Sequence, residues 1–82
     1  MEENESSVFY DSLENLVTAA NMHYDNTPIG ETPSALTCEI SPNTSAVRVH
    51  LLVSIIKGVN TIQMEIMENR VFLTLNWLYP RV

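Results

Sequence analysis

The chain has 82 residues, 45% of them hydrophobic, and ten acidic against four basic residues give a formal net charge of −6. This acidity argues against binding to nucleic acid or to an anionic membrane surface, because both depend on Lys and Arg side chains near phosphates. The single cysteine excludes an internal disulfide framework.

The chain begins with a polar stretch that is followed by an amphipathic pattern. Residues 1–7 carry three glutamates and are expected to form a flexible acidic tail. The next apolar residues recur at helical spacing, and they are Phe9, Leu13, Leu16, Val17, Ala20 and Tyr24. Asp11 and Glu14 near the start and His23 near the end suit the dipole of a helix. The pattern predicts a helix over about residues 8–24.

Residues 25–34 contain two prolines and a glycine, which predicts a linker between the helix and the first strand. Each proline follows a threonine, so Thr27 and Thr32 could be proline-directed phosphorylation sites. We favour the simpler interpretation that these are threonines in a proline-containing loop. Whether they are modified is left open by the sequence.

Four later segments alternate apolar and polar residues, as half-buried strands do. They cover about residues 35–41, 46–57, 61–67 and 70–78. Each segment would have one apolar face, and the apolar stripe of the helix needs such a surface. The sequence therefore predicts one α+β domain over residues 8–82, in which the helix packs on a four-stranded antiparallel β-meander.

The short connections give an independent check, because a slip of one residue would turn every side chain to the other face. A two-residue loop at 68–69 sets Ile66 opposite Val71. Loops at 58–59 and 42–45 would give the remaining pairs, which are Ile55 opposite Ile62 and Cys38 opposite Val49. All three hairpins then agree on the buried face.

The segment from Ala46 to Lys57 also admits a helix, because it is long, apolar and followed by Gly58, a residue that often ends helices. On a helix, Arg48 would lie opposite the other polar residues, which include His50 and Ser54. The strand leaves no such conflict on the inner face, so we prefer it and keep the helix as the alternative.

Catalysis is not indicated by the polar residues. Cys38 as nucleophile and His50 as base would be the first pair to consider, but the alternation points Cys38 into the core and His50 outward. Two His, one Cys and scattered carboxylates show no metal-ligand spacing. Asp11 and Glu14, one turn apart, suit the start of a helix better than a site. The sequence predicts a non-enzyme without cofactor or metal.

The outer face of the predicted sheet carries large apolar side chains where polar ones would be expected, which suggests a contact surface. The residues predicted to bind a partner are Leu52, Ile56, Glu65, Met67, Phe72 and Leu78. The same pairing would place Glu39 opposite Arg48 as an exposed ion pair. The last strand, over residues 70–78, would lie at a sheet edge and could pair with another strand.

These features predict a non-catalytic protein-interaction or assembly module, homodimeric through the outer sheet face or the last strand. The alternative is a small acidic inhibitor, such as a phage or virus product, that blocks a host nucleic-acid-processing or defence protein. We expect a protein partner and no nucleic acid, membrane or small-molecule substrate. An acidic start and the lack of long apolar runs predict an intracellular location, in cytoplasm or nucleus.

Overall fold

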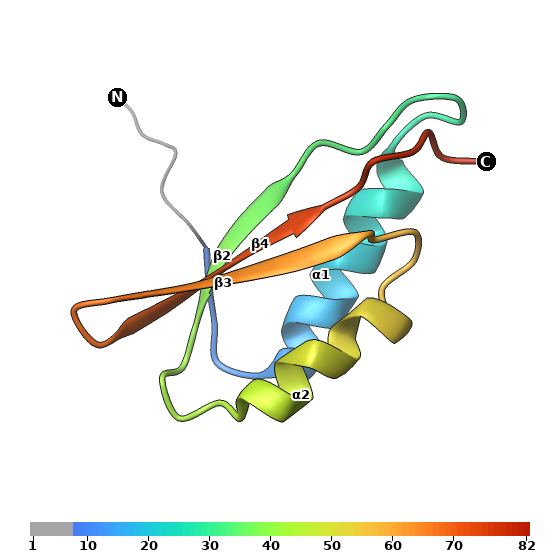
Figure 1. Cartoon of the computed structure of the whole chain (residues 1–82). Helices are drawn as coiled ribbons and strands as arrows, with labels where there is room; N and C mark the ends of the chain where they lie inside the picture. Colours follow the sequence, from blue (N-terminus) through green and yellow to red (C-terminus); the bar gives the residue numbers. More distant parts are fainter. Residues whose placement is uncertain (1–7) are drawn as a thin grey trace.

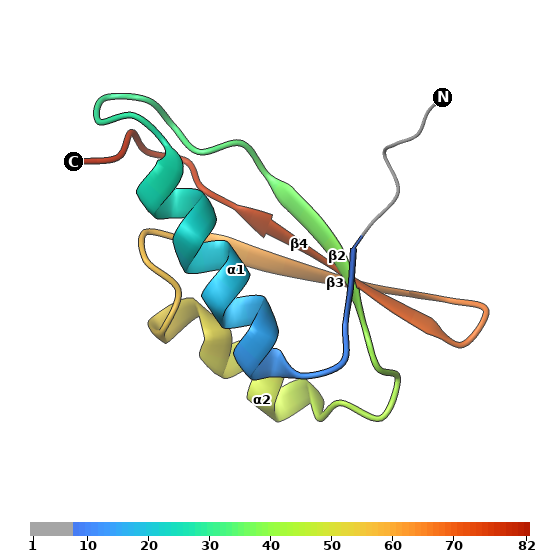
Figure 2. The ribbon, with the colours of Figure 1, turned by 180° about the vertical axis from the view of Figure 1, so that it is seen from behind.

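The computed structural model describes residues 8–82, and these form two layers, a four-stranded sheet and helices that cover one of its faces (Figures 1 and 2). In chain order the elements are β1 (Val8–Tyr10), α1 (Leu13–Asn26), β2 (Leu36–Ile40), α2 (Ala46–His50), the 3-10 helix η1 (Leu51–Ser54), β3 (Thr61–Met67) and β4 (Arg70–Asn76). The predicted α+β class is confirmed. Within residues 8–82, no helix has the length and apolar character needed to cross a membrane.

The sheet is mixed, so the predicted purely antiparallel meander is wrong. The strand order is β1-β2-β4-β3. β1 runs parallel to β2, whereas β4 runs antiparallel to both β2 and β3. The parallel pair follows from α1, which carries the chain back across one face of the sheet before β2 begins. β4 then lies between β2 and β3, although β3 precedes it in the chain.

The first helix starts later than predicted. Val8–Tyr10, which the helical pattern over 8–24 includes, is a strand, and its β-branched and aromatic residues suit that structure. Ser12 lies between β1 and α1 and is the N-cap of the helix. Its hydroxyl accepts a hydrogen bond from the backbone N–H of Asn15 at 3.2 Å. The expectation of a flexible tail concerns residues 1–7, which lie outside the described residues.

Residues 46–54 of this segment are helical and residues 55–57 form a turn, so the predicted second strand is wrong and the alternative of a helix is correct for most of the segment. Val49, Leu52 and Ile56 are spaced at i, i+3 and i+7 and are all buried. A strand would have left Leu52 and Ile56 on the solvent-exposed face, whereas both are buried in the structure, Leu52 on η1 and Ile56 in the turn that follows it. The predicted pairs that involved this segment are therefore also wrong, namely Ile55 with Ile62 and Cys38 with Val49.

Gly58 turns the chain from η1 toward β3, and two constraints require glycine there. Its φ is +69°, in the region that side chains disfavour. A Cβ atom on this residue would also lie 2.6 Å from Cε1 of Tyr24, on α1. The backbone of the connection therefore passes directly against the ring of Tyr24.

The β3–β4 hairpin has the predicted register. Ile66 lies opposite Val71, and Met67 lies opposite Arg70. The loop between them consists of Glu68 and Asn69, whose φ angles are 50° and 68°. Two residues with positive φ make a type I′ turn, which matches the twist of the flanking strands.

The core lies between the helices and the two central strands. It is built from Leu16 of α1, Leu52 of η1, Ile40 of β2, and Leu73 and Leu75 of β4, all of which are almost fully buried. Trp77 also belongs to the core, and it donates its indole N–H to the carbonyl oxygen of Lys57 at 2.8 Å. The helices thus cover β2 and β4 more completely than they cover β3.

Candidate functional site

β3 is an edge strand of the sheet, and six of its seven residues are exposed. The prediction that the last strand lies at the edge is wrong, because β4 is paired on both sides. The other edge is β1, which has only three residues. β3 therefore offers the longer unpaired edge within residues 8–82.

The type I′ turn decides which backbone groups of β3 face outward. In a hairpin with a two-residue loop, the residues that flank the loop form a hydrogen-bonded pair, and such pairs then alternate along the ladder. Met67 and Arg70 flank the loop, so the odd-numbered residues of β3 bond to β4. The N–H and C=O groups of Ile62, Met64 and Ile66 point away from the sheet.

The side chains of the same three residues lie on the helix-covered face, opposite Leu75, Leu73 and Val71 of β4. The helices do not cover the end of β3, where Met64 is 40% exposed and Ile66 is 65% exposed. Figure 1 shows why, because the end of the hairpin extends past both helices. We call Ile62, Met64 and Ile66, with their outward backbone groups, the β3 edge surface.

The β3 edge surface lacks the usual protection against strand pairing. Proteins blunt exposed edges with proline, lysine, bulges or covering loops. Residues 61–67 contain neither proline nor lysine, and their pairing with β4 is continuous. The charged residue of the strand is Glu65, whose side chain lies on the opposite face of the sheet from Met64 and Ile66. Nothing on this strand opposes the addition of another one.

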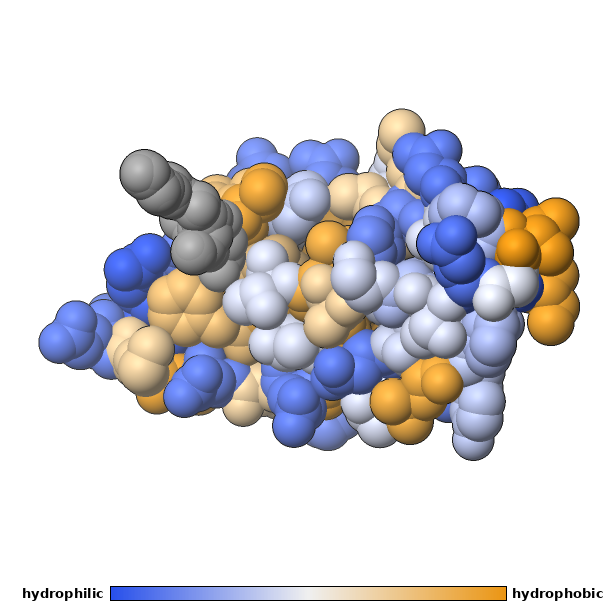
Figure 3. All heavy atoms as spheres, turned by 90° about the horizontal axis from the view of Figure 1, so that it is seen from above, coloured by the Kyte–Doolittle hydropathy of each residue, from blue (hydrophilic) through white to orange (hydrophobic). Residues whose placement is uncertain are grey.

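The outer face of the sheet, which faces away from the helices, is more polar than predicted. Toward the hairpin end of this face, Arg70 binds both carboxylate oxygens of Glu39 at 2.9 and 3.0 Å and covers the ring of Phe72. The hydrogen bonds from Arg70 lower the pKa of Glu39. Glu39 thus pairs with Arg70 and not with Arg48, which lies on α2. Viewed from the side away from α2, hydrophobic atoms form small separate groups (Figure 3).

The six residues predicted to bind a partner do not come together. Leu52 and Ile56 are only 2% and 3% exposed, so their predicted place on the outer face is wrong. Glu65, Met67 and Phe72 do share that face, on neighbouring strands. Leu78 is exposed beyond the end of β4. Met64 and Ile66 were not among the predicted residues, because the alternating pattern implies that every apolar side chain of β3 is covered.

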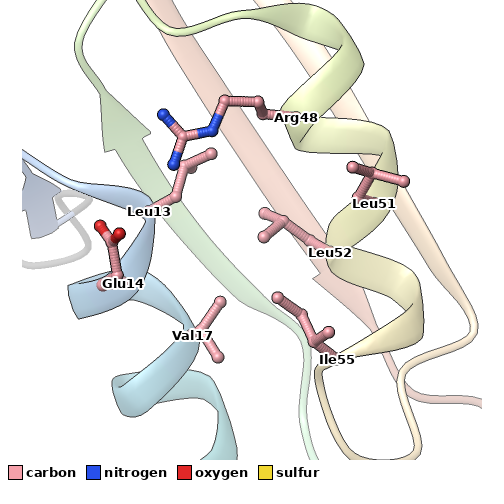
Figure 4. A pocket seen from close by; sticks show the side chains of 7 residues that line it. All are labelled: Leu13, Glu14, Val17, Arg48, Leu51, Leu52 and Ile55. Carbon is pink, nitrogen blue, oxygen red and sulfur yellow. The ribbon is translucent and has the colours of Figure 1, made fainter.

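A small apolar hollow of about 180 Å³ lies between the two helices (Figure 4). α1 contributes Leu13, Glu14 and Val17, and the facing helical segment contributes Arg48, Leu51, Leu52 and Ile55. Leu51 and Ile55 are exposed there. The hollow is too small for most ligands, whose pockets measure roughly 300–1,000 Å³.

Cys38 has the properties of a core side chain and not those of a nucleophile. It is buried on β2 between Val8 and Leu73, and burial raises the pKa of its thiol to about 11. A reactive thiol needs the opposite shift. His50, the base considered with it, lies exposed at the end of α2. Residues 8–82 contain no cluster of three or more His, Cys, Asp or Glu side chains that could hold a metal ion.

Comparisons of the chain with protein-family models, with curated proteins and with solved structures found no match.

Proposed function

We propose that this protein is a non-catalytic interaction module that binds an extended segment of another polypeptide along β3. The partner segment would become the next strand of the sheet, beyond β3. This mode of recognition takes its affinity from main-chain hydrogen bonds and its specificity from alternate side chains. The sheet face and the last strand, which the sequence analysis favoured as contacts, are replaced here by the β3 edge.

The observation that carries the proposal is the coincidence of two features on one strand. The free backbone groups of β3 belong to Ile62, Met64 and Ile66, and two of these residues, Met64 and Ile66, also have exposed apolar side chains on the face of the sheet that carries the helices. A strand placed alongside would therefore satisfy the backbone groups and cover Met64 and Ile66 together. Hydrogen bonds give direction to the contact, and apolar burial adds about 25 cal/mol per Å² of covered surface.

The helical layer supplies a neighbouring wall for such a strand. η1 lies beside β3, and its Val53 is partly exposed. Helical spacing places Val53 on the flank away from Leu51 and Ile55, which line the hollow toward α1. An added strand with apolar residues on its inner face would therefore contact Val53 as well as Met64.

The test compares two lysine substitutions at exposed apolar positions. Met64→Lys places a charge in the middle of the β3 edge surface, whereas Val47→Lys places the same charge on α2, where Val47 is 69% exposed. Affinity capture from the native host, quantified by mass spectrometry, should lose its specific partners with Met64→Lys and keep them with Val47→Lys. Equal thermal stability of both variants is the folding control.

Hydrogen exchange on a captured complex makes the test specific to the edge. The amide protons of Ile62, Met64 and Ile66 should become protected, and those of Val8 and Phe9 on the other edge should not. Partners that Met64→Lys captures as well as the wild type does would contradict the proposal.

The alternative, an acidic inhibitor of a nucleic-acid-processing protein, has less support. A mimic of phosphates needs a track of free carboxylates on one face. Asp25 is paired with Lys57 at 3.0 Å, and Glu39 is paired with Arg70. Further carboxylates, such as Glu14 and Glu65, lie on separate elements. The intracellular location remains an expectation from the sequence.

A further inference from the structure

We infer that the strand that occupies the β3 edge is β3 of a second copy of this chain, in antiparallel pairing, with Met64 on the twofold axis. This inference rests on the proposed function and names its partner. It depends on three independent properties of residues 61–67, which are the positions of the free backbone groups, the charges and the apolar side chains.

The free backbone groups are symmetric about Met64. Antiparallel strands exchange two hydrogen bonds at each hydrogen-bonded pair, and Ile62, Met64 and Ile66 are the residues whose groups point outward. With Met64 on the axis, Ile62 faces Ile66 of the second copy and Met64 faces its own equivalent. This register uses all three residues of both strands and gives about six hydrogen bonds.

The charges select the same register. With Met64 on the axis, Glu65 lies opposite Gln63 of the second copy, and an amide can donate to a carboxylate. Moving the axis to Glu65 would set two glutamates directly opposite each other, which is unfavourable. Moving it to Gln63 would require Asn60 to pair with Ile66, yet the backbone N–H of Asn60 already bonds to the carbonyl oxygen of Asn76 at 2.8 Å.

The apolar side chains complete the match. On the helix-covered face, the row across the axis would consist of Ile62 against Ile66, Met64 against Met64 and Ile66 against Ile62. The two most exposed of these, Met64 and Ile66, would be covered by the second copy. Methionine at the axis suits a contact between identical side chains, because its flexible thioether adapts to the space available. The contact is isologous and closes as a dimer.

The dimer would contain one continuous eight-stranded sheet. The strand order β1-β2-β4-β3 of one copy would continue as β3-β4-β2-β1 of the second copy. The helices of both copies lie on the same face, since the pairing continues the sheet without turning it over. Each copy carries a net charge of −6, so long-range repulsion opposes association, and added salt should strengthen the dimer. Binding to a basic partner would show the opposite dependence on salt.

Disulfide cross-linking tests the register. Gln63 and Glu65 of the second copy should face each other, so a mixture of the Gln63→Cys and Glu65→Cys variants should form a mixed disulfide under mild oxidation. Each variant alone should remain uncross-linked, because the Cα atoms of identical residues would be about 8 Å apart, beyond the reach of a disulfide. A mixture of Gln63→Cys and Thr61→Cys is the control on the same face. A disulfide in that mixture, or with one variant alone, would overturn the register.

The oligomeric state tests self-pairing itself. Sedimentation or light scattering at increasing protein concentration should show a dimer, with a dissociation constant that decreases as salt is added. Met64→Lys should raise that constant at least tenfold, and Val47→Lys should leave it unchanged. A monomer at about 100 μM (Kd near 1 mM or weaker, about −4 kcal/mol), or a dimer that Met64→Lys does not weaken, would overturn the inference. If the protein is monomeric but Met64→Lys abolishes capture of host partners, the proposed function stands and the strand at the β3 edge comes from another protein.

Discussion

β3 and β4 are the two arms of one hairpin, equal in length and similar in their alternation of apolar and polar residues, yet they differ completely in burial. The inward side chains of β4 are buried, and Leu73 is 0% exposed. Its neighbour across the ladder, Met64, is 40% exposed. The difference arises because α1 and α2 cover the middle of the sheet. The same sequence pattern thus gives a core strand in one arm and an exposed edge strand in the other.

The largest effect should come from removing one side chain from each arm. Leu73→Ala would leave a cavity in the core and should lower the free energy of unfolding by about 2–5 kcal/mol. Met64→Ala should lower it by less than about 1 kcal/mol, because its side chain is partly in water already. Chemical denaturation of both variants, at a concentration where association is absent, measures the difference. Equal losses would show that β3 belongs to the core.

The pH dependence of stability tests the burial of Cys38 in the core. Its thiol has a pKa of about 11, against 9.0 for an unperturbed group. Below pH 9 the thiol is protonated in both states. Between pH 9 and 11 it ionises in the unfolded chain only, so stability falls as pH rises, by about 2–3 kcal/mol for two pKa units. The free energy of unfolding, measured from pH 8 to 11, should decrease less steeply with pH in Cys38→Ala than in the wild type. Tyr10, whose pKa burial also raises, titrates in both proteins. Equal slopes would contradict the burial argument.

A smaller effect is expected at Gly58, which sets where β3 starts. Gly58→Ala should lower the free energy of unfolding by roughly 1–2 kcal/mol, from positive φ and from contact with Tyr24. Gly30→Ala is a matched control, because Gly30 has a φ of +92° but a Cβ added there would meet no atom within 4 Å. Thermal unfolding of both variants isolates the contact with Tyr24. If the two losses are equal, the Tyr24 ring moves aside without cost.

The β3–β4 hairpin was predictable because its information is local. Ile66 and Val71 are five residues apart, and the two-residue loop fixes their register as soon as the alternation is seen. The start of α1 was obscured for a related reason. Phe9 lies four residues before Leu13, so it extends the helical spacing although Ser12 separates the strand from the helix.

The segment 46–57 misled because it satisfies two periods at once. Its odd-numbered residues from Val47 to Ile55 alternate as in a strand, while Val49, Leu52 and Ile56 follow a helix. The signal that favoured the helix was the free-energy cost of exposing Leu52 and Ile56 to water, as a strand would have done. The position of β4 between β2 and β3 was not readable, because strand order depends on contacts between distant segments. For that reason the edge that forms the candidate site was assigned to the wrong strand.

The strand order also has a consequence for the kinetics of folding. β2 ends at Ile40, and its antiparallel partner β4 starts at Arg70, about thirty residues later. The β3–β4 hairpin can close on its own within about 1–10 μs. The docking of β4 against β2 must instead close a long loop, and such non-local contacts slow folding. We expect the hairpin to form early and its attachment to β2 to limit the rate.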